Sequence, residues 1–200
     1  MNQIVLIDKN WKLKFKSTTS NLDKSIPQEI NATVPGCIHT DLINAGVIDD
    51  ISINGKESDQ MWIWRAESSY FTTLKMQSAN KRHFLKFHGL DTLANIRVNG
   101  EIKMQTKNMH RSYLLEVTDE ITSADVRLEI DFEAPLSNAE AQVQKLGLYP
   151  RPYDMPYNYQ RKMACSFGWD WGPITISSGI WKQVELISFE KSAIESIAAI

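Results

Sequence analysis

Apolar and polar residues alternate along much of the chain, and this alternation predicts strands that each expose one face to solvent. The clearest run, Val126 to Glu133, places four apolar residues on one face and four charged residues on the other. The segment His83 to His88 repeats the alternation, and the aromatic and threonine-rich run Met61 to Met76 has the composition of strands. Further strands are expected at Tyr113 to Val117 and at Trp181 to Phe189.

Turn and helix signals complete the prediction of the fold class. The pair Asn99-Gly100 lies between apolar positions and predicts a hairpin with a two-residue type I′ turn. A short helix is expected at Thr40 to Gly46, where Thr40 can cap the start and Gly46 the end. A weaker helical pattern covers Asn138 to Leu146. Many short strands and only one or two short helices favour an all-β fold, an antiparallel sandwich or jelly roll.

Length and charge narrow the class of protein further. The 200 residues, 42% apolar and 23% charged, fit one globular domain, which we place at 1–190. A net charge of −2 gives no electrostatic reason to expect nucleic acid or an anionic membrane as partner. The first residues contain only four consecutive apolar positions and no basic leader, so we expect no signal peptide and a cytoplasmic or already processed protein. Residues 191–200 turn apolar, and we expect them to begin a further domain.

The usual signatures of metal, cofactor and nucleophilic chemistry are missing from the sequence. Cys37 and Cys165 stand outside any CxxC pattern; one disulfide bridge is possible, but two buried thiols are favoured. The four histidines are scattered, and neither a Gly-x-Ser-x-Gly elbow nor a phosphate-binding loop occurs. The acids Glu129, Asp131 and Glu133 share one face of a strand and are interpreted as its solvated side. We therefore expect no metal, no cofactor and no catalytic residue in this chain.

The most distinctive segment runs from Arg161 to Pro173 and contains Trp169, Asp170 and Trp171 between glycines. Sugars are bound by aromatic faces that cover their C–H patches and by carboxylates or guanidinium groups that hydrogen-bond their hydroxyls. On a regular strand the two tryptophans would share one face as core residues, and the acid would lie on the exposed face. The flanking glycines and proline instead favour an irregular loop, as does the proline- and tyrosine-rich segment Gly147 to Tyr159.

The segment Cys165 to Pro173, followed by Gly179-Ile180-Trp181, resembles the β-mannosidases of glycoside hydrolase family 2, including the lysosomal type. The resemblance covers nearly the whole chain and favours β-mannosidase over the related β-galactosidases and β-glucuronidases. Its upstream motifs follow in the same order: Trp11-Lys12-Leu13-Lys14-Phe15, Val34-Pro35-Gly36-Cys37-Ile38-His39-Thr40-Asp41-Leu42, Gly89-Leu90-Asp91-Thr92-Leu93-Ala94, Val98-Asn99-Gly100 and Asn108-Met109-His110-Arg111.

The resemblance implies a galactose-binding-like jelly roll, the non-catalytic amino-terminal domain of a retaining, exo-acting β-mannosidase. In that family a separate (β/α)₈ barrel supplies the catalytic glutamates, so this chain is expected to be inactive alone. By motif match, Trp169 and Asp170 line the pocket for a terminal β-mannoside, and Asp170 accepts hydrogen bonds from sugar hydroxyls. Arg161 is a further candidate, which would orient that carboxylate or contact the sugar.

Three other interpretations stay open at this point. The chain could be a stand-alone carbohydrate-binding module, a relative of β-galactosidases or β-glucuronidases, or a structural or protein-interaction domain. Under the β-mannosidase interpretation, the expected partners are the carbohydrate and the catalytic barrel of the same polypeptide. Trp11, Trp181 and the pair Pro35-Gly36 are interpreted as structural.

Overall fold

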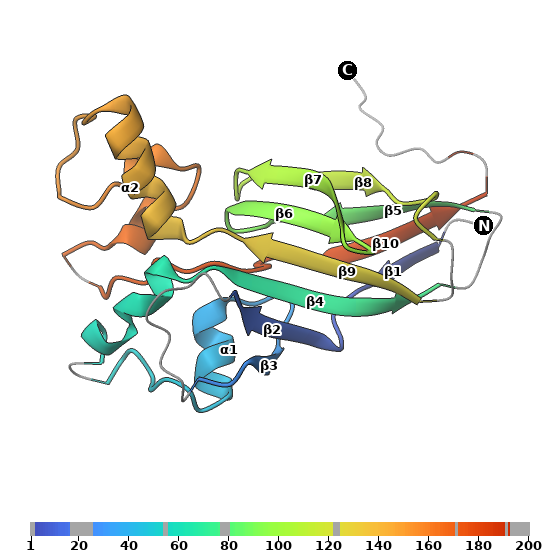
Figure 1. The fold of residues 1–200 in the computed structure, drawn as a ribbon, viewed down its shortest axis with the longest axis horizontal. Coiled ribbons are helices and arrows are strands. Elements are labelled where there is room, and N and C mark those ends of the chain that lie inside the picture. The colour runs from blue at the N-terminus through green and yellow to red at the C-terminus, as the bar shows by residue number, and fades with distance from the viewer. Residues whose placement is uncertain are drawn as a thin grey trace, which may run out of the picture.

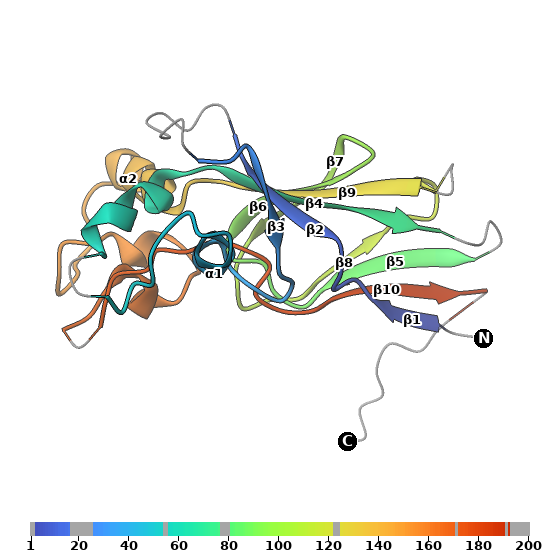
Figure 2. The ribbon, with the colours of Figure 1, turned by 90° about the horizontal axis from the view of Figure 1, so that it is seen from below.

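A computed structural model describes residues 3–16, 26–53, 56–76, 81–121, 125–170, 172–190 and 192. They form two antiparallel sheets that pack as two layers (Figures 1 and 2). The six-stranded sheet has the order β3-β2-β4-β9-β6-β7, with β2 (Trp11–Phe15), β3 (Glu29–Ala32), β4 (Ser68–Lys75), β6 (Leu93–Val98), β7 (Glu101–Lys107) and β9 (Asp125–Phe132). The four-stranded sheet has the order β1-β10-β5-β8, with β1 (Gln3–Leu6), β5 (Arg82–Phe87), β8 (Tyr113–Glu116) and β10 (Val184–Phe189). The expected all-β antiparallel sandwich is confirmed.

The core lies between the two layers and follows the alternation of the sequence. On β9, Val126, Leu128 and Ile130 are each at most 1% exposed. Leu85 and Phe87 of β5 are fully buried on the other sheet. Full burial of such a side chain contributes about 1.5–3 kcal/mol, so this stripe supplies much of the force that holds the layers together.

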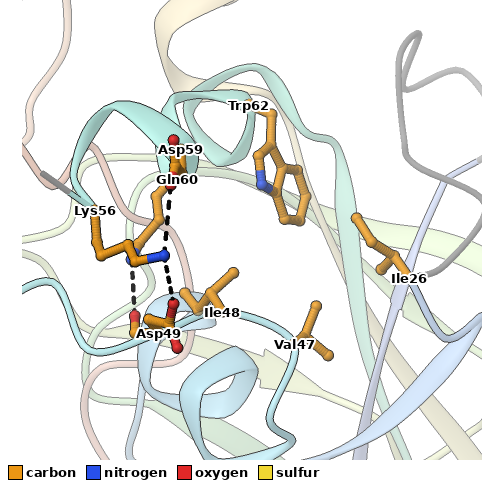
Figure 3. Close-up of a pocket in the computed structure, with 8 residues that line it drawn as sticks. All are labelled: Ile26, Val47, Ile48, Asp49, Lys56, Asp59, Gln60 and Trp62. Atoms are coloured by element: carbon orange, nitrogen blue, oxygen red, sulfur yellow. Dashed lines mark hydrogen bonds and ion pairs between the residues drawn. The ribbon is translucent and has the colours of Figure 1, made fainter.

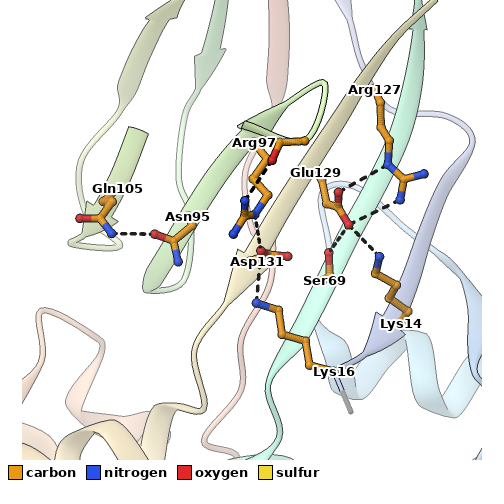
Figure 4. A network of polar contacts seen from close by, with 10 residues as sticks. Lys14, Lys16, Ser69, Asn95, Arg97, Gln105, Arg127, Glu129 and Asp131 are labelled. Atoms are coloured by element: carbon orange, nitrogen blue, oxygen red, sulfur yellow. Dashed lines mark hydrogen bonds and ion pairs between the residues drawn. The ribbon is translucent and has the colours of Figure 1, made fainter. Parts of the chain in front are cut away.

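The outer face of β9 differs from the expected solvated face. Glu129 accepts a 2.7 Å hydrogen bond from Lys14, while Asp131 pairs with Lys16 at 3.2 Å and with Arg97 at 2.8 Å (Figure 4). Asp131 is only 5% exposed. The interpretation of Asp131 as a solvated acid is therefore wrong, because long cationic side chains from β6 and from the end of β2 lie over it.

Two of the local predictions hold with small shifts. Asn99 and Gly100 have φ values of 51° and 89°, positive at both positions as a type I′ turn requires, and they connect β6 to β7. The short helix is α1 (Ile38–Asn44), which begins before Thr40. Cys37 takes the N-cap position instead of Thr40, since the amide of Asp41 already donates to the Cys37 carbonyl at 3.1 Å.

Other boundaries move for reasons of packing. The first part of the run Met61 to Met76 is a 3₁₀ helix, η1 (Ser58–Arg65), rather than a strand. Ile63 and Trp64, which are adjacent residues of this helix, are both buried. Adjacent residues of a strand point to opposite faces, so a strand with one solvated face would expose one of them. The helix α2 (Pro135–Leu146) starts three residues earlier than expected, with proline in its first turn. Trp181 lies outside β10, and the segment around it is irregular.

Among their described residues, the two expected loops contain the short helical turns η2 (Tyr157–Tyr159) and η3 (Ala164–Phe167) and a bridge between Trp169 and Gly172. Both cysteines are free thiols, but they are not both buried as expected. Cys165 is exposed, because η3 turns Phe167 inward instead, and Cys37 is half-buried. No helix of the described residues is long and apolar enough to cross a membrane. The domain start expected in 191–200 falls outside the described residues, apart from Ser192.

Candidate functional site

The segment that contains Trp169 and Asp170, coloured orange to red, lies at the end of the sandwich that also carries α2 and η1 (Figures 1 and 2). The backbones of Trp169 and Gly172 pair as an antiparallel bridge, which places Asp170 at the tip of a tight turn. The Trp169 side chain is 50% exposed, and Asp170 is exposed as well. Trp171 falls outside the described residues. The pair thus presents an aromatic surface and a carboxylate to whatever lies beyond this end.

Tyrosines of the neighbouring loop extend the aromatic surface. The ring of Tyr153 meets Trp169 edge to face, with the centroids 5.9 Å apart, and stacks on Tyr157 at 4.9 Å. Such pairs contribute about 0.5–1.5 kcal/mol beyond the area they bury. The contacts hold the indole of Trp169 in place while half of its surface stays accessible.

The flanks of the turn are fixed from two sides. Phe167 is fully buried and anchors the first flank in the core. Gly168 has φ of +101°, and a Cβ atom there would meet the Ile174 side chain at 2.7 Å, so glycine is required. On the second flank the amide of Ile174 donates to Glu57 Oε1 at 2.8 Å, which connects the loop to the start of η1.

A buried ion pair lies at the base of the loop. The ammonium group of Lys162 contacts Asp91 Oδ2 and donates to the carbonyl oxygen of Ser177 at 2.7 Å. The Lys162 side chain is fully buried, and burial lowers its pKa, an effect that the neighbouring Asp91 opposes. Asp91 is fixed through its backbone, which exchanges two hydrogen bonds with Gly179 at 2.9 and 3.1 Å.

His39 joins this cluster from α1. Its Nδ1 lies 3.1 Å from the hydroxyl of Ser177, and the residue is only 7% exposed. Burial, and secondarily the positive charge of Lys162, lower the pKa of His39 to about 4. The imidazole is therefore neutral at pH 7.

The motifs that carry the family resemblance meet behind the loop. His39 belongs to the motif Val34–Leu42, Asp91 to Gly89–Ala94 and Met109 to Asn108–Arg111. The carbonyl of Met109 accepts a 3.1 Å hydrogen bond from Trp181 Nε1, and its amide donates to the Arg161 carbonyl at 3.0 Å. The sequence pattern does not indicate that four residues distant in the chain lie close together in the fold: His39, Asp91, Lys162 and Ser177.

Arg161 lies apart from the other two site candidates. It is exposed and lines a separate hollow of about 620 Å³ with residues such as Asn158 and Gln160, and neither Trp169 nor Asp170 belongs to that lining. Within the described chain, Arg161 forms no ion pair with Asp170. The sugar-binding roles of Trp169, Asp170 and Arg161 all stay predictions.

A smaller hollow of about 200 Å³ lies beside η1 (Figure 3). Trp62 and Val47 line its apolar side. Its charged side is occupied by internal pairs, with Lys56 2.9 Å from Asp49 and 3.9 Å from Asp59. In the part of the chain that the structure covers, no three His, Cys, Asp or Glu side chains come close enough together to hold a metal ion.

Comparison with known proteins identifies the relatives of this domain. Residues 11–182 match the family described as the glycosyl hydrolase 2 galactose-binding domain-like family. The chain is 31% identical over 192 residues to a β-mannosidase of Bos taurus, covering 90% of this chain and 21% of that protein. A β-mannosidase B of Aspergillus terreus is 31% identical over 164 residues, 78% of this chain and 19% of that protein. The chain thus spans about a fifth of the length of these relatives.

Solved structures agree with the sequence comparison. The crystal structure of a β-D-mannosidase from Dictyoglomus thermophilum has a TM-score of 0.80 and 30% sequence identity, over 92% of this chain and 22% of that one. An exo-chitosanase of Amycolatopsis orientalis, with a TM-score of 0.65 and 15% identity, shares the fold. With a family match over residues 11–182 and these relatives, the chain belongs to the glycosyl hydrolase 2 galactose-binding domain-like family.

Proposed function

We propose that this chain is the amino-terminal, non-catalytic domain of a retaining, exo-acting β-mannosidase. In this proposal Trp169 and Asp170 form one wall of the pocket for the terminal mannose, and a catalytic domain of the same polypeptide supplies the acid and the nucleophile. The observation that carries the proposal is the exposed Trp169–Asp170 turn, flanked by the buried Phe167, in a chain about 30% identical to β-mannosidases.

The chemistry of the turn supports a role in binding a sugar. Trp169 offers a half-exposed aromatic face, on which the C–H face of a pyranose can stack. Asp170, at the tip, can accept charge-assisted hydrogen bonds from sugar hydroxyls. Because both groups project outward from one end of the sandwich, a neighbouring domain would have to form the opposite wall. A retaining glycosidase also needs two carboxyl groups about 5 Å apart, which the proposal assigns to that neighbour.

The proposal is tested by the hydrolysis of chromogenic glycosides. We compare the 200-residue chain with the product of the complete reading frame that contains it, using 4-nitrophenyl β-mannoside, β-galactoside and β-glucuronide. The complete product is expected to hydrolyse the β-mannoside with the highest kcat/KM, and the 200-residue chain is expected to hydrolyse none of them.

Two results would contradict the proposal in different ways. A preference of the complete product for the galactoside or the glucuronide would refute the assignment of the substrate. Binding of mannose or mannobiose to the 200-residue chain in calorimetry, together with an inactive complete product, would instead indicate a stand-alone carbohydrate-binding module.

A further inference from the structure

We propose that Lys162 is a positioning residue, whose ammonium group closes the base of the loop 163–176 and so fixes Trp169 and Asp170 in the shape that binds the sugar. The inference rests on the proposed function, and it assigns a role to a buried charge that does not itself reach the sugar-binding surface.

The first step is that one side chain joins the two ends of the loop. Lys162 immediately precedes the loop, and Ser177 follows it. The 2.7 Å hydrogen bond from Lys162 Nζ to the Ser177 carbonyl therefore brings together backbone positions 15 residues apart. A loop whose ends are fixed loses much less conformational entropy when it orders its tip.

The second step is that the same ammonium group attaches the loop to the sandwich. Its other contact is the carboxylate of Asp91, between β5 and β6. That carboxylate also accepts a hydrogen bond from the Thr92 hydroxyl, and the Thr92 carbonyl accepts one from Thr106 of β7 at 3.0 Å. Asp91 is thus held directly by Thr92 and Gly179, and through Thr92 it is connected to β7. Because Asp91 is fixed by these bonds, the base of the loop takes its position from it.

The third step concerns why a buried ion pair occupies the base of the loop. Exchanging a buried ion pair for well-packed apolar residues is often neutral or stabilising, so a gain in overall stability does not explain the pair. Directional hydrogen bonds, by contrast, specify where atoms lie. His39 reinforces the position of Ser177 through its hydroxyl, at 3.1 Å. The cluster therefore specifies geometry at the base of the one loop that carries Trp169 and Asp170.

Hydrogen–deuterium exchange on the 200-residue chain tests the structural half of the inference. Lys162→Met removes the ammonium group while keeping an apolar stem, and Asp91→Asn removes the charge of its partner. Lys75→Met is the matched control, because Lys75 pairs with Asp125 at 2.7 Å at the opposite, exposed end of the sandwich (Figure 1). We expect amides of residues 163–177 to exchange at least tenfold faster in both cluster variants, with a smaller change in β4 and β9. The control should exchange like the wild type.

Kinetics of the complete protein test the functional half. Lys162→Met should lower kcat/KM for the β-mannoside at least fivefold. If Lys162 acts through the loop, Lys162→Met combined with Asp170→Ala should lose little more than Asp170→Ala alone, since both changes remove the same interaction. If Lys162 only stabilises the fold, the loss in kcat/KM caused by Lys162→Met should instead add to the loss caused by Asp170→Ala.

Three outcomes decide between the claims. Exchange that rises equally in the loop and the sheets, or not at all, overturns the positioning role of Lys162. Additive losses in the double variant overturn it as well. If the loop of the 200-residue chain loosens as expected but the complete wild-type protein hydrolyses no β-mannoside, the proposed function is refuted and the closing of the loop by Lys162 stands. If Lys162→Met fails to fold, Asp91→Asn carries the same tests.

Discussion

Replacing His39 by asparagine should change how the stability of the protein responds to mild acid. Folding lowers the pKa of His39 from 6.5 to about 4 through burial and the charge of Lys162. The unfolded chain therefore takes up a proton near pH 6.5, whereas the folded chain resists protonation until about pH 4. For a base with a lowered pKa, stability is complete above the unfolded value and is lost as pH falls through this window.

The magnitude follows from the shift. One pKa unit corresponds to about 1.4 kcal/mol, so this histidine should cost the wild type about 2–3 kcal/mol of unfolding free energy between pH 7.5 and 4.5. Asparagine can replace the Nδ1 contact to Ser177 without titrating. Between pH 7.5 and 4.5 the free energy of unfolding should fall in both proteins. We expect the fall in His39→Asn to be smaller than the fall in the wild type by this amount.

Urea unfolding at several pH values measures the difference. His110→Asn is the matched control, because His110 is exposed and its replacement leaves the buried cluster intact. Apart from the replaced histidine, the titratable groups are common to all three proteins, so their contributions cancel in the comparison. Parallel loss of stability in the wild type and His39→Asn would refute the account of a buried, neutral histidine.

Two further predictions concern the loop and its surroundings. Phe167→Ala should destabilise the 200-residue chain by about 3–5 kcal/mol, since the ring is fully buried. Calorimetry should show a loss of roughly 10 °C in Tm, and a loss under about 1 kcal/mol would mean that the loop is not anchored in the core. Cys165 is exposed and Cys37 half-buried, so a thiol reagent should modify Cys165 first in the native protein; mass spectrometry that finds Cys37 modified first would contradict the described burial.

The strands could be predicted because the alternation of apolar and polar residues that defines them is a local property of the sequence. On β9, apolar residues point inward and charged residues outward at every second position, so the pattern itself records the layer structure. The turn at Asn99-Gly100 follows from residues that tolerate positive φ. The expected exposure of the acids failed at Asp131, because its neighbours come from strands distant in sequence.

The base of the candidate site could not be predicted for the same reason. In the sequence, Lys162 was one residue of the segment Arg161 to Pro173, and Asp91 was one residue of a motif shared with the β-mannosidases. Only the folded chain places them in contact, with Ser177 as the third partner. The Trp169-Asp170 pair was found in the sequence because two aromatic residues around an acid, between glycines, are unusual on a strand. The sequence did not reveal the buried contacts at the base of the loop that carries this pair.

The most direct test of the account is the effect of Asp170→Ala on the complete protein. We measure kcat/KM for 4-nitrophenyl β-mannoside, with Asp154→Ala, another exposed acid at the same end of the sandwich, as the matched control. The account predicts that Asp170→Ala lowers kcat/KM at least tenfold, about 1.4 kcal/mol of transition-state stabilisation, and that Asp154→Ala stays within twofold of the wild type. An Asp170→Ala protein as active as the wild type would contradict the claim that this domain forms part of the sugar pocket.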